Sequence, residues 1–120
     1  MTRINAGIPP NELSDKHLLA EHREIKRIPN AIRNNRANLL DLPKEFTLGQ
    51  GHVRFFYDKL FYLFKRYKSL LKECRRRGFN VTDFSKAWDR SPPSLCGDWE
   101  PTPEAVNLIK QRIKDRTTQP

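Results

Sequence analysis

One glutamate stands among basic residues in the first third of the chain, where the residue types could act on a substrate that carries phosphates. Arg23 and Arg27 lie four residues apart and share a helical face with Lys16. Glu24 lies beside this row, and His17 is close to it on the same helical projection. Cations in such a row can contact phosphates, and a carboxylate among them can transfer protons. Intrahelical ion pairs on a solvated face explain the same spacing and are, from these residues alone, the preferred interpretation.

Basic residues recur later in the chain, and the formal net charge is +9 over 120 residues. Two further sets stand at helical spacing: Lys65, Lys68 and Lys72, and then Lys110, Arg112, Lys114 and Arg116. A field of this sign suits a polyanion, with nucleic acid as the first candidate. Solvation of helix surfaces is the plain alternative. An anionic membrane is a weaker one, because the basic stretches also carry acids and show no lipid-facing half.

The first basic row must be positioned by a helix. Ser14 is suited to cap it, and Asp15 in its first turn opposes the helix dipole. Within this predicted helix, which is expected to end near Asn34, apolar residues recur at heptad spacing: Leu18, Ile25 and Ile32. Pro29 falls inside this pattern and lacks a backbone N–H, so we expect it to kink or split the helix.

Two more helices follow from periodicity and capping signals. Apolar residues keep a helical period from Val53 to Cys74, which predicts a central core helix, and Gly78 is well placed as its C′ residue. Thr102 and Pro103 then form a strong helix start, with a cap followed by proline in the first position. This last helix is expected to end near Arg116, leaving a short polar tail over residues 117–120.

The rest of the chain reads as connections. Residues 1–13 form an extended arm that ends in a turn, residues 36–50 form a loop, and residues 79–100 form a longer loop that Trp88 and Trp99 pin to the core. The sequence therefore predicts an all-α fold, a compact single domain over residues 1–120 with three main helices joined by long loops.

Composition argues against several classes of protein. The first residues lack the apolar region of a signal peptide, and no stretch is long and apolar enough to span a bilayer. Cys74 occupies an apolar position of the central helix and Cys96 lies in a loop, so they form no disulfide framework. No Cys and His residues have metal-ligand spacing, so no metal is expected. A reduced, cytoplasmic protein fits best.

Four segments carry a resemblance to a known family. They are Met1–Asn5, Ala20–Glu24, Arg77–Asn80 and, longest and most specific, Leu48–Leu60 with the sequence LGQGHVRFFYDKL. Together they resemble the phage-type pyrimidine-dimer DNA glycosylase/AP lyase, also called the ultraviolet-repair endonuclease V family. The resemblance covers most of the chain and is thin between Val81 and Glu100.

The resemblance implies roles for particular residues. Met1 would be removed, the freed α-amine of Thr2 would attack the sugar, and Glu24 would be the catalytic glutamate. Lys16 replaces a neutral polar residue of the family pattern. The resemblance implies DNA contacts by seven basic residues: Arg3, Lys16, His17, Arg23, Arg27, Arg112 and Arg116. The partner would be damaged double-stranded DNA, with no cofactor, and the protein is expected to be a monomer.

An α-amine suits this role because its ordinary pKa is about 7.7–8.0, against about 10.4 for lysine. Attack at C1′ would expel the base and give an imine, and β-elimination would then break the strand. A carboxylate at Glu24 could stabilise the positive charge that builds on the sugar. The family also implies kinked DNA and an extruded nucleotide.

Two alternatives stay open. The chain could be a basic helical DNA-binding protein without catalysis, or a lyase or glycosylase for other base damage. Well-known members of the family carry an aromatic tail against the damaged bases, whereas residues 117–120 contain no aromatic. Stacking is worth about 1–3 kcal/mol per base, so we expect weaker recognition of the dimer than of an abasic site.

Overall fold

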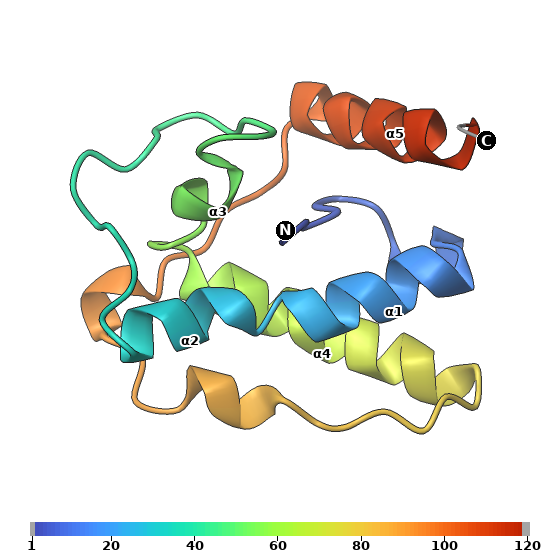
Figure 1. Ribbon diagram of the computed structural model, residues 1–120, viewed down its shortest axis with the longest axis horizontal. Coiled ribbons are helices and arrows are strands. Elements are labelled where there is room, and N and C mark those ends of the chain that lie inside the picture. Colours follow the sequence, from blue (N-terminus) through green and yellow to red (C-terminus); the bar gives the residue numbers. More distant parts are fainter. Residues whose placement is uncertain (1, 119–120) are drawn as a thin grey trace.

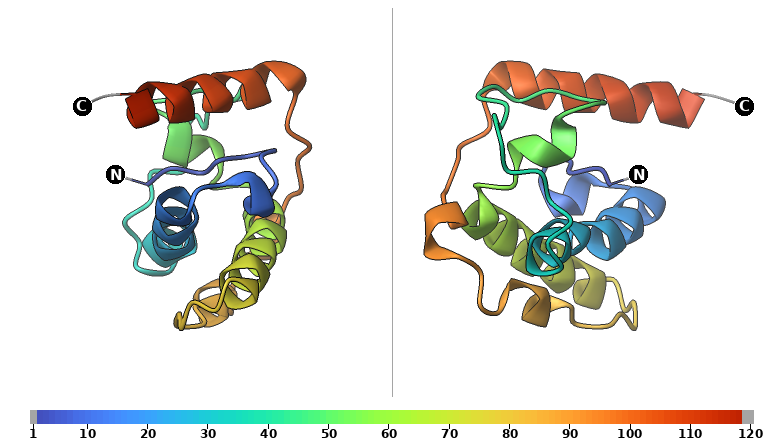
Figure 2. Two further views of the ribbon diagram at one scale, coloured as in Figure 1. Left: turned by 90° about the vertical axis from the view of Figure 1, so that its right-hand side faces the viewer. Right: turned by 60° about the vertical axis from the view of Figure 1, so that its left-hand side comes forward.

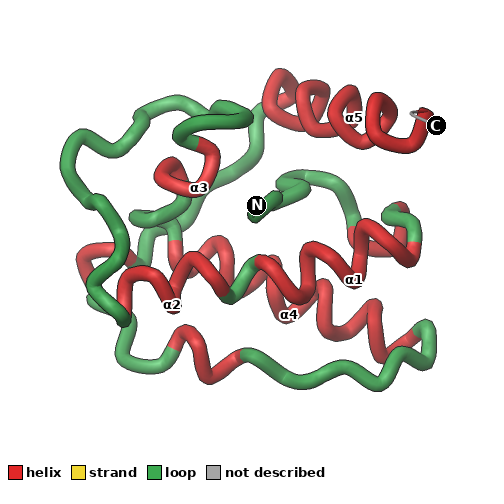
Figure 3. The backbone as a smooth tube through the Cα atoms, viewed as in Figure 1, coloured by secondary structure: helices red, strands yellow, loops and turns green. Residues whose placement is uncertain are grey.

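The computed structural model describes residues 2–118. All the regular elements in this part of the chain are helices, which confirms the predicted all-α class (Figures 1 and 3). Three short 3-10 helices accompany the α-helices. In chain order the elements are η1 (Pro10–Glu12), α1 (Asp15–Glu24), α2 (Arg27–Arg33), α3 (His52–Phe55), α4 (Leu60–Arg76), η2 (Ser85–Trp88), η3 (Pro93–Leu95) and α5 (Pro103–Thr118).

The first predicted helix is split at the expected proline. Ser14 caps α1 by accepting a hydrogen bond from the His17 N–H, as its sequence indicates. Pro29 has no N–H to offer the carbonyl of Ile25, four residues earlier, and its ring would collide with that carbonyl in a continuous helix. The chain therefore turns at Ile25 and Lys26, and α2 starts at Arg27 with Pro29 in its first turn.

The prediction of one unbroken helix from Val53 to Cys74 is wrong. A single turn, α3, is followed by an irregular stretch, and α4 begins only at Leu60. The interruption is held from outside, because the Gly97 N–H donates to the Asp58 carbonyl at 3.1 Å. A β-carbon on Gly97 would stand 2.5 Å from that carbonyl oxygen, so only glycine permits this approach. The spacing of apolar residues along the sequence does not predict a backbone contact of this kind.

Both predicted helix ends on either side of the long loop are confirmed. Gly78 has a φ of +83°, and the N–H of Phe79 donates to the Cys74 carbonyl at 2.9 Å, which closes α4 with a Schellman motif. Thr102 caps α5 through its hydroxyl, which accepts from the Ala105 N–H at 3.1 Å. The helix continues to Thr118, so the predicted polar tail from residue 117 is helical over its first two residues, and residues 119–120 lie outside the described part.

The N-terminal arm lies between two helical layers. In Figure 1, α1 and α2 run in line across the front of α4, α5 lies above them, and the arm passes between; the turned views of Figure 2 keep this order. The arm is part of the core, since Ile4, Ala6, Ile8 and Leu13 are buried. The site is therefore built around an extended segment that no strand pairs with.

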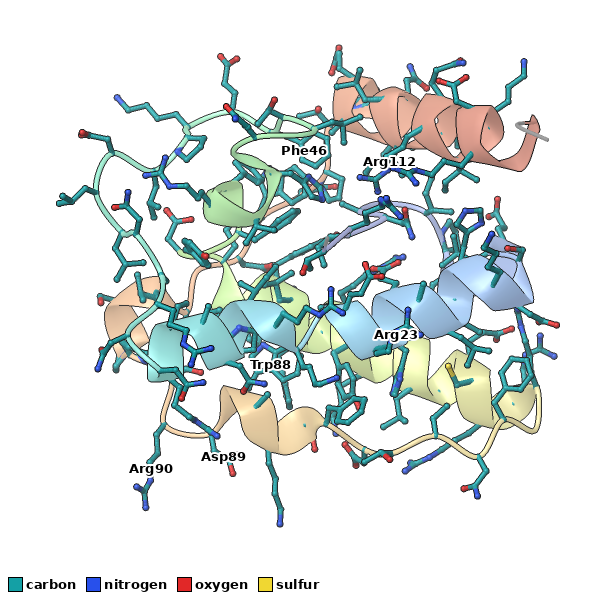
Figure 4. The ribbon with its side chains drawn as sticks, in the orientation of Figure 1. Arg23, Phe46, Trp88, Asp89, Arg90 and Arg112 are labelled. Atoms are coloured by element: carbon teal, nitrogen blue, oxygen red, sulfur yellow. The ribbon has the colours of Figure 1, made fainter. Side chains whose placement is uncertain are left out.

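The long loop after α4 is anchored by its aromatic residues, as predicted. Trp88 is buried against Phe64 and Tyr67. Trp99 stacks on Phe46 with a centroid distance of 5.8 Å, within a larger aromatic cluster beneath α5. Figure 4 shows Phe46 in the upper part of the view near α5 and Trp88 in the lower part near α2. Of the two cysteines, which are unpaired, Cys74 is buried and Cys96 is exposed.

Candidate active site

Glu24 is the last residue of α1, and its carboxylate points at the N-terminal arm. The main-chain N–H of Arg3 donates to Glu24 Oε1 at 3.0 Å. The other oxygen, Oε2, lies 3.7 Å from the guanidinium of Arg23. The side chain of Glu24 is 10% exposed, whereas that of Arg23 is 60% exposed. The carboxylate is thus held one residue from Thr2, with a solvent-facing cation beside it.

Below the arm lies a buried ion pair that sequence reasoning missed. Arg66 of α4 donates from Nε to Glu21 Oε2 at 2.8 Å, and both side chains are buried. Glu21 also accepts from the Asn5 side-chain amide at 2.9 Å, and Arg66 donates to the Ile8 carbonyl. Burial by itself would lower the pKa of Arg66, but the charge of Glu21 and its hydrogen bonding to Arg66, together with Tyr62, outweigh burial, so the pKa is raised. Through its bonds to Asn5 and to the Ile8 carbonyl, this pair fixes the arm from below.

His52, at the start of α3, was also missed. Its Nε2 accepts a hydrogen bond from the main-chain N–H of Ile4 at 3.1 Å, and its Nδ1 lies 2.9 Å from the Thr47 carbonyl. The imidazole is buried, and burial lowers its pKa to about 4. The one sequence signal for it is its position inside the long segment Leu48–Leu60 that carries the family resemblance.

A second group of the predicted residues gathers around His17. Burial lowers the pKa of His17, and the charges of Lys16, Arg112, Arg116 and Arg3 lower it further, in that order. These residues come from the arm, from the first turn of α1 and from the second half of α5, so the fold brings together cations that are more than a hundred positions apart in sequence. The result is a locally positive surface next to Thr2.

Arg112 reaches from α5 down to the arm, as Figure 4 shows. Its Nη2 donates to the Asn5 side-chain oxygen at 2.9 Å and to the Ile4 carbonyl at 3.4 Å. Burial lowers its pKa to about 10, and the nearby charge of Arg3 adds to this effect. The Nε atom of Arg3 is itself buried without a hydrogen-bond partner. Two arginines crowded in this way can take up an anion such as a phosphate.

Arg23 and Arg27 lie on either side of the break between α1 and α2, and both are exposed. They share a neighbour, Lys26, whose pKa is lowered by burial and then by the charges of Arg27 and Arg23. The Lys26 ammonium donates to the Arg23 carbonyl at 2.8 Å and lies 3.8 Å from the centre of the Phe84 ring. Lys26 is thus occupied within the fold, and the two arginines extend the positive surface beyond Glu24.

The predicted residues therefore form one connected region. The end of α1 brings together Thr2, Arg3, Arg23 and Glu24. The arm is flanked by Lys16, His17, Arg112 and Arg116. Arg27 continues the row of cations onto α2. Within residues 2–118 no group of three or more His, Cys, Asp or Glu side chains could hold a metal ion. None of the helices in this part of the chain is long and apolar enough to cross a membrane. The arrangement places the mostly buried carboxylate of Glu24 beside the N-terminal arm, within a cationic surface.

A helical domain with an acid beside its N-terminal segment and cations on both sides is suited to chemistry on nucleic acid. A family model described as pyrimidine dimer DNA glycosylase matches residues 1–87, which include the arm and α1 to α4. The chain belongs to the pyrimidine dimer DNA glycosylase family. Its class is therefore a DNA-repair enzyme, as the resemblance in the sequence predicts, and α5 with Arg112 and Arg116 lies beyond the matched segment.

Proposed function

We propose that this protein cleaves the N-glycosidic bond of a pyrimidine in a dimer through an imine between the sugar and the α-amine of Thr2, and that it then breaks the DNA strand by β-elimination. The observation that carries the proposal is the hydrogen bond of 3.0 Å from the Arg3 N–H to Glu24 Oε1. It brings a carboxylate next to the start of the chain, where an amine and an acid can act on the same sugar carbon. Thr2 is partly exposed, so a substrate can reach it.

The nucleophile requires processing of Met1, which lies outside the described residues. Its removal turns the Thr2 nitrogen from a peptide N–H into a primary amine, and roughly a tenth of such amines are unprotonated at neutral pH. The positive charges of Arg3 and Arg112 disfavour further charge on that nitrogen. Glu24 acts in the opposite direction and can accept the proton that the nitrogen loses on attack.

The bonds change in a defined order. The Thr2 nitrogen bonds to C1′ while the bond from C1′ to the base breaks, and the base leaves with the electron pair and takes up a proton. The sugar ring then opens between C1′ and O4′, the nitrogen lone pair forms the imine, and O4′ takes up the proton lost by the nitrogen. Loss of a C2′ proton expels the phosphate from C3′ and breaks the strand. Water finally hydrolyses the imine and restores the amine.

We propose that the surrounding cations hold the DNA backbone during these steps. Arg23 and Arg27 are exposed near Glu24, at the end of α1 and the start of α2, and Lys16 of α1 and Arg116 of α5 are also exposed. The set proposed to bind DNA is Arg3, Lys16, His17, Arg23, Arg27, Arg112 and Arg116. Contacts of this kind give affinity without reading sequence, and their free energy offsets the cost of unstacking the damaged bases.

Borohydride trapping on abasic and dimer-containing duplexes tests this function. A covalent adduct should form with the native protein, and peptide mapping should locate it at Thr2 after removal of Met1. Blocking the N-terminus chemically should abolish the adduct. A protein that keeps Met1, or a blocked protein that nicks abasic DNA at the full rate, contradicts the mechanism.

The Glu24→Gln variant separates catalysis from binding in the same assay. We expect its single-turnover rate to fall by about 10²–10⁴-fold, because glutamine keeps the shape but loses the charge and the proton acceptor. Its affinity for abasic DNA should stay within about threefold, since phosphate contacts dominate binding. The exposed Glu45→Gln is the matched control and should behave as wild type. An inactive wild-type protein that still binds DNA would indicate a binding protein instead.

A further inference from the structure

Ile4 has no neighbouring strand, yet both polar atoms of its backbone are hydrogen-bonded by side chains. His52 of α3 accepts from the Ile4 N–H at 3.1 Å, and Arg112 of α5 donates to the Ile4 carbonyl at 3.4 Å. The residue is fully buried, so water cannot serve as a substitute partner. Two side chains from distant parts of the sequence thus do for this arm what a paired strand does in a sheet.

The geometry around His52 fixes its tautomer. The Thr47 carbonyl can only accept, so the proton lies on Nδ1, which leaves Nε2 as an acceptor for Ile4. The ring is held edge-on between Phe46 and Phe56, each with a centroid distance of 5.4 Å. His52 is therefore a rigid, oriented acceptor, whose position follows from packing and from the turn at residues 47–52.

This contact lies close to the proposed nucleophile along the chain. The residue before Ile4 is Arg3, whose N–H is held by Glu24, and the residue before that is Thr2. Two extended residues span only about 7 Å, so a shift of the arm at Ile4 moves the Thr2 nitrogen by a similar amount. A displacement of about 1 Å between reacting groups can reduce a rate about 100-fold.

We infer that His52 is a positioning residue for the reaction, because the hydrogen bond that it accepts from Ile4 sets where the arm presents the Thr2 nitrogen relative to Glu24. His52 touches the arm and acts through it. The inference rests on the proposed function of Thr2 and Glu24, and it assigns a role to a residue that carries no predicted chemistry.

Two isosteric variants isolate this hydrogen bond. His52→Gln and His52→Met both lose the bond to the Thr47 carbonyl and fill a similar volume, but only glutamine offers an oxygen near the Nε2 position. We expect borohydride trapping at saturating abasic DNA to be about 10–100-fold slower for His52→Met, with affinity for that DNA within about threefold of wild type. His52→Gln should regain most of the lost rate. A defect in folding alone would lower the two variants together and would not separate rate from affinity.

Exchange of the Ile4 amide hydrogen provides a readout that needs no DNA. It should be slow in wild type, fast in His52→Met and slowed again in His52→Gln, with thermal unfolding recorded for each protein. If His52→Met does not fold, His52→Asn takes its place, because asparagine can reach Thr47 but not Ile4. A wild-type protein that forms no adduct refutes the proposed function, and the role of His52 with it. If the wild-type protein is trapped and His52→Met is trapped at the same rate, the role of His52 is refuted while the proposed function stands. The same holds if both variants lose the trapping rate equally.

Discussion

Arg66 within α4 and Arg77 at the C-cap of α4 make the same kind of junction. Each guanidinium bonds a carboxylate of α1, with Arg66 Nε at 2.8 Å from Glu21 and Arg77 Nη1 at 2.9 Å from Asp15. Each also donates to a main-chain carbonyl of the segment before α1. The two junctions differ in their surroundings, since the Glu21 side chain is 0% exposed and that of Asp15 is 70% exposed.

This difference decides what each junction contributes. If one partner of a buried pair is removed, the other is left as a charge that water cannot solvate, which is strongly destabilising. At the exposed junction, water takes the place of the missing partner, and Arg77 keeps its second carboxylate, Glu73, at 2.7 Å. The same chemistry therefore fixes the arm at Arg66 and only supports the start of α1 at Arg77.

The largest expected effect is that of Glu21→Gln, which leaves Arg66 buried without its charge partner. We expect the free energy of unfolding at pH 7 to fall by about 3–5 kcal/mol, measured by urea denaturation. Replacing both residues with apolar ones, Glu21→Leu with Arg66→Met, should cost less than the single change, because no buried charge remains. A loss below about 1 kcal/mol for Glu21→Gln would show that burial does not distinguish the two junctions.

A smaller effect is expected from acidification, which acts on the arm through His52. Its pKa falls from 6.5 in the unfolded chain to about 4 in the folded protein, where burial is the main cause, Arg112 adds to it, and the Thr47 carbonyl and Glu21 oppose it. The unfolded state thus binds more protons between pH 6.5 and 4, so stability falls as pH falls through this window, by about 3 kcal/mol for this group.

Urea denaturation at pH 7 and at pH 5 checks this prediction. His52→Gln should show a shallower loss of stability over that interval than wild type, since it has no imidazole to protonate. The pKa of Glu73 is lowered to about 2, mainly by its hydrogen bonds with Arg76 and Arg77, so the stabilisation that it provides is lost only below about pH 4.5. An equal slope in the variant and in wild type would rule out His52 as the source.

The smallest effect should come from Asp15→Asn at the exposed junction. Its Tm is expected to fall by on the order of a few degrees or less, because the ion pair is solvated and asparagine keeps part of the favourable interaction with the first turn of α1. Calorimetry on this variant beside Glu21→Gln gives the direct comparison. A drop in Tm as large as that of Glu21→Gln would remove the contrast between the two regions.

Helix ends were predictable from sequence wherever the signal is local. The cap at Ser14, the break before Pro29, the left-handed Gly78 and the cap at Thr102 each depend on a few neighbouring residues, whose backbone preferences are the same in any fold. The site residues Thr2 and Glu24 were predicted from the family resemblance, and their catalytic roles stay predictions. What the structure adds is that an arm N–H next to Thr2 is bonded to Glu24.

The interruption between α3 and α4 was not predictable in the same way. Its residues keep an apolar helical period, and the carbonyl of Asp58 is instead bonded by Gly97, which lies far along the chain. Periodicity reports which side chains avoid water and says nothing about a backbone contact supplied by a distant loop. The contacts of Glu21 with Asn5 and of His52 with Ile4 were missed for the same reason, because each joins a helix to the arm between residues that are distant in sequence.

By itself, the sequence determined the helical class, the helix ends that have local signals, the positive charge and the family. Only the tertiary structure decided that an unpaired N-terminal segment would be buried and that side chains from α1, α3, α4 and α5 would bond its backbone and Asn5. The physical reason is that a buried polar group must find a partner, and in an arm without a neighbouring strand that partner has to come from wherever the helices pack.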